Sequence, residues 1–188
     1  TPVIGRRLRD VRNEFVLPTN LGESEVSLAA GSEGNLSDQD PSVTCEDIAW
    51  LREIGSGAPV VVKGLTRADD AIRCLDADAA AVWVSNHGGR QLDGCVACAD
   101  ALVEVLAAVD GRGEVYVDGG IRSGLDALRA LAMGATAVFV GRPVLWGLTT
   151  GGDAGVQAVM QGLTAELAHA MALAGAASIG ELTPDLLA

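Results

Sequence analysis

The sequence has few aromatic residues, a single lysine and no long apolar run. Three Trp, one Tyr and two Phe stand among 188 residues, so Ala, Val and Leu must supply most of the core. No run approaches the roughly 20 apolar residues of a membrane span, and residues 1–10 lack the apolar segment of a signal peptide. The net charge of −12 argues against binding to nucleic acid or to anionic membranes. We therefore expect a soluble protein with a cytoplasmic location.

The four cysteines do not form a recognisable metal-binding pattern. Cys95 and Cys98 have the spacing of half a zinc site or of a redox pair, but no second pair follows. Cys45 and Cys74 lie apart from them in the sequence. Small buried thiols in a reducing compartment are the commoner interpretation, so we expect no metal.

Strands and helices alternate along most of the chain. The helices are expected after a capping box at 66–69, over about 100–109, from the cap Ser123 to about 133, and over about 153–173. Four short apolar runs predict strands at 59–63, 80–86, 114–118 and 136–140. This repeated order predicts parallel strands joined by right-handed crossovers.

Polar or glycine-rich turns follow the predicted strands. Lys63 ends the first strand and His87 follows the second, while 118–122 and 141–143 follow the third and fourth. In a parallel α/β barrel the chemistry lies at this carboxyl end, and the last two loops hold phosphate. A doubly wound open sheet would normally have a glycine-rich turn after its first strand, and none is seen there.

Four parallel strands cannot close into a barrel, which needs about 250 residues for eight strands. We therefore predict an α/β fold that is the second half of a (β/α)8 TIM barrel, with strands 5 to 8. Residues 1–188 would form the C-terminal part of one barrel domain. The first half is expected on a separate chain, on a cleaved portion, or on residues left out of this sequence, and it would be a partner of this chain.

The turn Ser85-Asn86-His87-Gly88-Gly89-Arg90-Gln91 contains the strongest functional signal. A histidine exchanges protons near neutral pH, and an arginine can hold a carboxylate through two parallel hydrogen bonds. These are parts of an active site for an acid substrate. The alternatives are that His87 is only a loop residue and that Lys63 extends to solvent from a strand end. For His169 and for Trp50, Trp83 and Trp146, surface or packing roles are the simpler interpretation.

The turns 85–93, 118–122 and 141–143 resemble those of the FMN-dependent 2-hydroxy acid oxidases and dehydrogenases, which include mandelate, glycolate and lactate oxidases. The resemblance implies the FMN-binding barrel fold. It also implies that His87 is the catalytic base and contacts the substrate, that Arg90 and Arg7 bind its carboxylate, and that Lys63 and Ser85 contact the flavin. The ribityl and phosphate groups would then be bound by Asp118, Gly119, Gly120, Ile121, Arg122, Gly141 and Arg142.

The family's first strands, its active-site tyrosines and the aspartate that pairs with the histidine have no counterpart in this sequence. The resemblance places that aspartate directly before Thr1. The stretch 21–40 is rich in small and polar residues and is expected to be a flexible loop over the active site. A homo-oligomer is also expected.

The leading hypothesis is FMN-dependent oxidation of a 2-hydroxy acid to a 2-oxo acid. An aromatic, mandelate-like substrate and O2 as electron acceptor are preferred, by general likeness. Lactate or glycolate oxidase or dehydrogenase activity is the first alternative. Another FMN- or phosphate-binding barrel enzyme, such as an isomerase, and a non-catalytic half-barrel binding module are the others.

Overall fold

The computed structural model describes residues 12, 40 and 42–187, and strands and helices alternate through most of this part of the chain. A short 3-10 turn η3 (Cys45–Asp47) leads into helix α2 (Ile48–Ile54), and two further 3-10 turns, η5 (Ile179–Glu181) and η6 (Pro184–Leu186), close the described part. Between them lie β1 (Val61–Leu65), α3 (Ala68–Asp76), β2 (Ala81–Val84), the turn η4 (His87–Gly89), α4 (Cys98–Val109), β3 (Glu114–Asp118), α5 (Gly124–Met133), β4 (Ala137–Phe139) and α6 (Arg142–Ala174).

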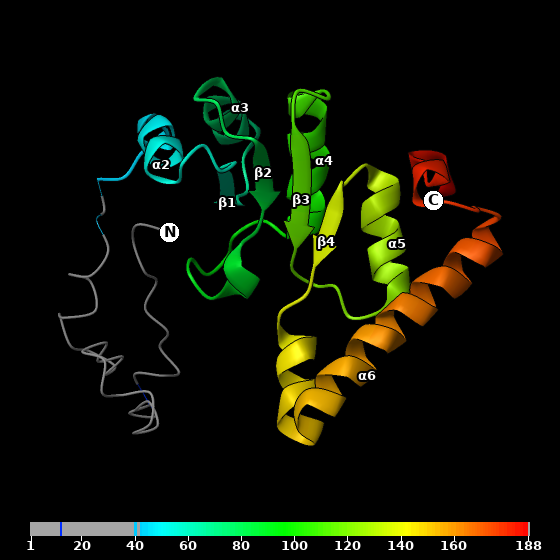
Figure 1. Ribbon diagram of the computed structural model, residues 1–188. Helices are drawn as coiled ribbons and strands as arrows, with labels where there is room; N and C mark the ends of the chain where they lie inside the picture. Colours follow the sequence, from blue (N-terminus) through cyan, green and yellow to red (C-terminus); the bar gives the residue numbers. More distant parts are fainter. Residues whose placement is uncertain (1–11, 13–39, 41, 188) are drawn as a thin grey trace.

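The strands form one parallel sheet in the order β1-β2-β3-β4. Consecutive strands are neighbours, as right-handed strand–helix–strand units in a barrel wall require. Figure 1 shows the strands running the same way, with the loop after β2 and the start of α6 beyond their carboxyl ends. Every turn that the sequence marks as functional therefore lies at one edge of the sheet.

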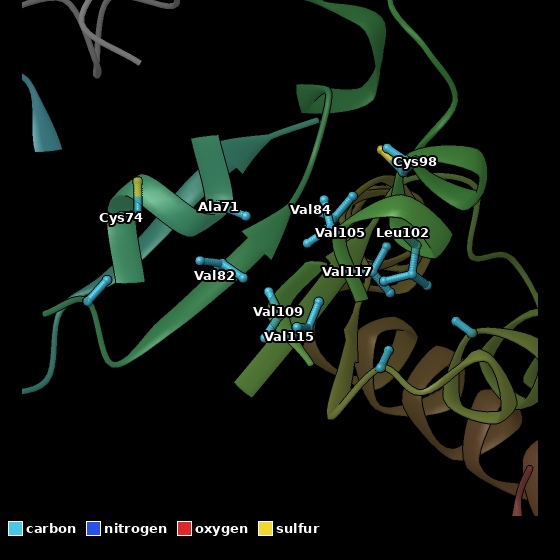
Figure 2. Close-up of a cluster of buried hydrophobic side chains, with 14 of the residues drawn as sticks. Ala71, Cys74, Val82, Val84, Cys98, Leu102, Val105, Val109, Val115 and Val117 are labelled. Carbon is cyan, nitrogen blue, oxygen red and sulfur yellow. The ribbon is translucent and has the colours of Figure 1, made fainter. Parts of the chain in front are cut away.

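The core lies between the sheet and helices α3, α4 and α5. Alternate strand residues point toward these helices, and Val82, Val84, Val115 and Val117 are almost completely buried. Figure 2 shows them against the apolar side of α4, which contributes Leu102, Val105 and Val109. Burial of each such side chain stabilises the fold by about 1.5–3 kcal/mol. Aliphatic side chains thus supply this core, as the composition predicts.

The opposite face of the sheet carries the aromatic residues. Trp83 stacks on Phe139 with ring centroids 3.8 Å apart, and Tyr116 makes an edge contact with Trp83 and a tilted contact with Phe139. Phe139 remains 37% exposed. Neither β1 nor β4 has a second neighbouring strand within the described residues. An aromatic face that the described residues cover only in part, together with two open edges, is what half of a closed barrel would present.

The predicted elements agree with the structure apart from their ends and one cap. The strand expected at 59–63 lies two residues later, while the one at 114–118 has the predicted bounds. Ser123 caps α5 through a reciprocal capping box with Asp126, as predicted. The capping box expected at 66–69 is wrong: Arg67 is the N-cap of α3, and Asp69 binds its guanidinium at 2.8–2.9 Å instead.

Helix α6 begins eleven residues before the predicted 153–173 and bends sharply. Its start at Arg142 has Pro143 in the first turn, a position that suits proline. Gly151 and Gly152 leave helical geometry, so two helical segments meet at this bend. After the bend, one face of the helix is half-buried, and His169 is exposed. The half-buried apolar residues are Val156, Val159, Leu163, Leu167 and Met171. The later segment packs along α5 (Figure 1).

Two helical glycines allow a matched test of this packing. A methyl group at Gly124 would collide with the backbone of Glu166 and Leu167 in α6, whereas one at Gly162 would meet nothing within 4 Å. Gly124→Ala should lower the free energy of unfolding by about 1–3 kcal/mol. Gly162→Ala should raise it by about 0.5–1 kcal/mol through helix propensity. Denaturant titration of both variants of the full-length protein measures this, and equal effects would contradict the close crossing.

Candidate active site

A pocket of about 410 Å³ opens at the carboxyl ends of the four strands. Each strand or the loop after it supplies part of the wall, which explains why residues far apart in the sequence meet here. The lining residues are Lys63, Trp83, His87, Gly88, Arg90, Gln91, Asp118, Gly119, Gly120, Ile121, Arg122, Phe139, Val140, Gly141, Arg142, Pro143 and Leu145.

A polar network joins the ends of β1, β2 and β3 at the floor of this pocket. The ammonium group of Lys63 lies 2.9 Å from an Asp118 carboxylate oxygen and donates to the hydroxyl of Ser85 at 3.0 Å. The Ser85 hydroxyl in turn donates to the other Asp118 oxygen at 2.6 Å. Ser85 is fully buried, and the Lys63 ammonium also lies 5.0 Å from the Trp83 ring. The network fixes a positive charge at the pocket floor.

The turn after β2 holds His87 in an unusual backbone conformation. His87 has a φ of +55°, and its N–H donates to the Ser85 hydroxyl at 3.1 Å. The Asn86 side chain accepts from the N–H of Gly89 at 3.2 Å and closes the turn. Left-handed backbone is uncommon in residues other than glycine, and it persists only where the surrounding structure enforces it. The turn therefore holds the His87 side chain in a defined position.

Gly64 leaves the space into which the imidazole fits. The register between β1 and β2 shifts between Lys63 and Leu65, and Gly64 has a φ of +103° at that irregularity. A methyl group on Gly64 would lie 2.7 Å from Cε1 of His87. The bulge thus brings strand β1 close to the ring while leaving no side chain between them.

The environment of His87 favours the neutral imidazole. Burial lowers its pKa below the ordinary value of 6.5, the Lys63 ammonium lowers it further, and Asp118 opposes both. A neutral imidazole can accept a proton at neutral pH, as a general base must.

This shift predicts a pH dependence. If neutral His87 is needed for turnover, kcat/KM should reach a plateau at high pH and fall as pH drops through an apparent pKa below 6.5. The pH profile of kcat/KM for the full-length protein measures this. In Lys63→Met the loss of the nearby positive charge should move the apparent pKa upward. An apparent pKa above 6.5 in the wild type would contradict the assignment.

The other side of the pocket is suited to an anion. Arg90, Arg122 and Arg142 join Lys63 in lining the pocket, and Asp118 supplies the one carboxylate among the described lining residues, although the chain carries a net charge of −12. Helix α6 begins at Arg142, so its first backbone N–H groups add partial positive charge. Methyl groups at Gly120 or Gly141 would meet nothing within 4 Å, so the wall between these residues is open.

The structure brings together most of the residues that the sequence singles out. Ser85 lies behind the pocket wall, where its hydroxyl orients Lys63 and Asp118, and Arg7 lies outside the described residues, as does most of the loop 21–40. The lining of the pocket includes the predicted residues His87, Arg90, Lys63, Asp118, Gly119, Gly120, Ile121, Arg122, Gly141 and Arg142. Their individual roles stay predictions.

Sequence reasoning missed Trp83, Phe139 and Gly64. Trp83 and Phe139 line the pocket, whereas packing was the interpretation given to Trp83. Trp50 and Trp146 are more than half exposed, and Trp146 stacks under the Arg122 guanidinium at 4.6 Å. Strand alternation was the available signal, because Lys63, Trp83 and Phe139 fall on the same side of the sheet.

Neither a metal-binding cluster nor a membrane-spanning helix is found among the described residues. Within residues 12, 40 and 42–187, no group of three or more His, Cys, Asp or Glu side chains is arranged to hold a metal ion. In the same part of the chain, no helix has both the length and the hydropathy needed to cross a bilayer.

Comparison with known families identifies the class of this protein. The model of the FMN-dependent dehydrogenase family matches residues 1–188. The chain belongs to this family, whose cofactor is FMN. Oxidoreductases that act on 2-hydroxy acids are among its relatives. Within this match lie the turns 85–93, 118–122 and 141–143, which resemble those of the family.

Several individual relatives are oxidases of 2-hydroxy acids. The chain is similar to an L-lactate oxidase from Nostoc sp. strain PCC 7120, with 47% identity over 99% of this chain and 54% of the relative. It is also 46% identical to 2-Hydroxyacid oxidase 1 of Mus musculus, over 100% of this chain and 54% of that protein. The chain thus spans about half the length of the curated relatives it matches.

Solved structures confirm the fold class. A mandelate oxidase structure with (S)-4-Hydroxymandelic acid matches 96% of this chain and 53% of its own, with a TM-score of 0.87 and 43% identity. Another with (S)-2-phenylpropionate gives a TM-score of 0.82 at 47% identity. The four-stranded parallel sheet is therefore the second half of a (β/α)8 barrel, as predicted.

Proposed function

We propose that the protein containing this chain oxidises a 2-hydroxy acid to a 2-oxo acid with FMN as cofactor. The observation that carries the proposal is the pocket in which His87, Arg90 and Lys63 are gathered at the carboxyl ends of adjoining strands. A base, a carboxylate-binding group and a fixed cation are the groups that this chemistry needs. Similarity to 2-hydroxy acid oxidases over the whole chain supports the same reaction.

The described residues fit FMN. Its phosphate would be held by Arg122, Arg142, the start of α6 and the open wall at Gly120 and Gly141, where no side chain fills the space. Its ring would be held near Lys63, and its ribityl hydroxyls by the loop at 118–122. A pocket of about 410 Å³ is within the usual range for small-molecule sites, about 300–1,000 Å³.

When bound, FMN accepts the two electrons that leave the α-carbon of the substrate. Arg90 binds the substrate carboxylate and so places the adjoining hydroxyl near the imidazole of His87. His87 takes the hydroxyl proton, which its lowered pKa allows at neutral pH. The Lys63 ammonium, held by Asp118 and Ser85, stabilises negative charge that develops at the pocket floor. Arg7 would add a second carboxylate contact, as the family resemblance implies.

Within this reaction we favour a mandelate-like aromatic substrate and O2 as electron acceptor. Support for the aromatic substrate comes from mandelate oxidase structures at 43–47% identity. Lactate is the second candidate, because an L-lactate oxidase is similar at 47% identity. Initial rates with mandelate, lactate and glycolate, followed by both O2 uptake and 2-oxo acid formation, separate them. A higher kcat/KM for lactate would overturn the aromatic preference, and product formation without O2 uptake would overturn the acceptor.

The remaining expectations stay predictions from the sequence. We propose that the first half of the barrel covers the aromatic face of the sheet formed by Trp83, Tyr116 and Phe139, and pairs with the open edges at β1 and β4. We also propose that the protein forms a homo-oligomer, that it is cytoplasmic, and that residues 21–40 form a loop over the site.

The carboxylate-binding role of Arg90 can be tested with a conservative variant. Arg90→Lys keeps the charge but loses the two-pronged geometry, so KM should rise about 10–100-fold. The rate at saturating substrate should change much less. Arg129→Lys is the matched control, because Arg129 lies on α5 and outside the pocket lining. An unchanged KM in Arg90→Lys would count against the assignment.

A further inference from the structure

Two cysteines that are far apart in the sequence meet outside the pocket. Cys45 begins the turn η3 before α2, and Cys74 lies in α3, 29 residues later. Their sulfur atoms are 3.0 Å apart, and both thiols are free. A disulfide bond needs about 2.05 Å between the sulfurs, so a shift of about 1 Å would allow the bond to form.

Both sulfurs are carried by well-anchored segments. The Thr44 side chain and Asp47 form a reciprocal capping box around η3, and Ile48, which follows directly, is buried in the core. Ala71 and Cys74 of α3 belong to the same core, where Figure 2 shows them beside Val82. The approach of the sulfurs is thus determined by packing on both sides, which favours their reaction with each other.

The two thiols differ in their access to solvent. Cys74 is only 1% exposed, and burial raises the pKa of its thiol to about 12, with a further contribution from its hydrogen bond with Cys45. Cys45 is half-buried, so it is the thiol of the pair that we expect a small oxidant to reach first. The arrangement therefore has an accessible sulfur for the first oxidation and a protected sulfur beside it that can complete the bond.

We propose that Cys45 and Cys74 are a reversible, peroxide-responsive disulfide pair that links η3 to α3. The Cys45 thiolate attacks one oxygen of hydrogen peroxide, the O–O bond breaks, and hydroxide leaves, giving a sulfenic acid. The Cys74 sulfur then attacks the Cys45 sulfur, the S–O bond breaks, and the thiol proton leaves with the oxygen as water. The two thiols lose two electrons and two protons in total, and the peroxide becomes two water molecules.

This pair would place a modification site close to the source of its oxidant. If the protein passes electrons to O2 as proposed above, it generates hydrogen peroxide, and that link rests on the proposed function. Disulfide formation with added peroxide does not rest on it. The two proposals can therefore fail separately.

Trypsin separates the cysteines cleanly. Cleavage after Arg12, Arg52, Arg73, Arg90 and Arg112 places Cys45 in the peptide 13–52, Cys74 in 74–90, and both Cys95 and Cys98 in 91–112. The folded full-length protein is treated with hydrogen peroxide, alkylated under denaturing conditions and digested. The expected product is a cross-link of 13–52 with 74–90, lighter by two hydrogens than the two peptides together and lost on dithiothreitol treatment.

Variants and the second cysteine pair give the controls. Cys45→Ser should abolish the cross-link and leave Cys74 alkylatable after denaturation, and Cys95→Ser should leave the cross-link unchanged. The proposal is overturned if peroxide converts Cys45 to its sulfinic acid without a cross-link. It is equally overturned if 13–52 links to 91–112 as readily as to 74–90.

Discussion

Replacing His87 with alanine should slow substrate oxidation by about 10²–10⁴-fold, the range found for loss of a general base. The imidazole lies in a pocket, in a turn with left-handed backbone, and against a glycine that leaves room for it. No other histidine of this chain can replace it, because His169 is the second of two and is exposed on α6. The rate of flavin reduction under anaerobic conditions measures the effect.

His169→Ala provides the matched control, because it makes the same change outside the pocket. It should leave the reduction rate unchanged. Bound FMN, measured by absorbance after gel filtration, should be retained in both variants, since His87 is assigned no part in holding the cofactor. A His87→Ala variant that keeps most of the wild-type rate would refute the assignment of this residue as the base.

Lys63→Met should lower the reduction rate by about 10²–10³-fold, which is typical of losing one preorganised electrostatic partner. The ammonium lies 2.9 Å from Asp118 and 3.0 Å from the Ser85 hydroxyl, so its position is fixed before substrate binds. The same substitution should also destabilise the fold, because the Asp118 carboxylate loses its countercharge in a partly buried position.

A double variant separates these two effects. In Lys63→Met with Asp118→Asn the unpaired charge is gone, so the free energy of unfolding should recover relative to Lys63→Met alone. The reduction rate should not recover, because the positive charge is still missing. Recovery of the rate in the double variant would show that Lys63 acts through folding and not through electrostatics at the pocket floor.

Local sequence patterns predict the elements of this fold well, for physical reasons. Short apolar runs bounded by turns mark the strands, and Ser123 with Asp126 marks the start of α5. The capping box expected at 66–69 fails because Asp69 has a stronger competitor than a backbone N–H, namely the Arg67 guanidinium at 2.8–2.9 Å. A cap therefore depends on what else its side chain can bind, and a spacing rule does not contain that information.

The part of the candidate site that follows from strand order can be predicted from the sequence, and the part that depends on side-chain packing cannot. The carboxyl ends of parallel strands must meet at one edge, so strand order alone places Lys63, His87, Asp118 and Arg142 together. The bulge at Gly64, the contact of Cys45 with Cys74 and the role of buried Ser85 depend on side-chain packing between segments. No periodicity in the sequence reports such contacts.

We propose above all that this pocket, in the full-length protein, brings FMN and a 2-hydroxy acid together for oxidation. Anaerobic addition of mandelate or lactate to the purified full-length protein, followed by flavin absorbance, tests it directly. We expect a yellow protein that is bleached by one or both acids and is not bleached by the corresponding 2-oxo acids. A colourless protein with no affinity for FMN, or a yellow one that no 2-hydroxy acid bleaches, would contradict it.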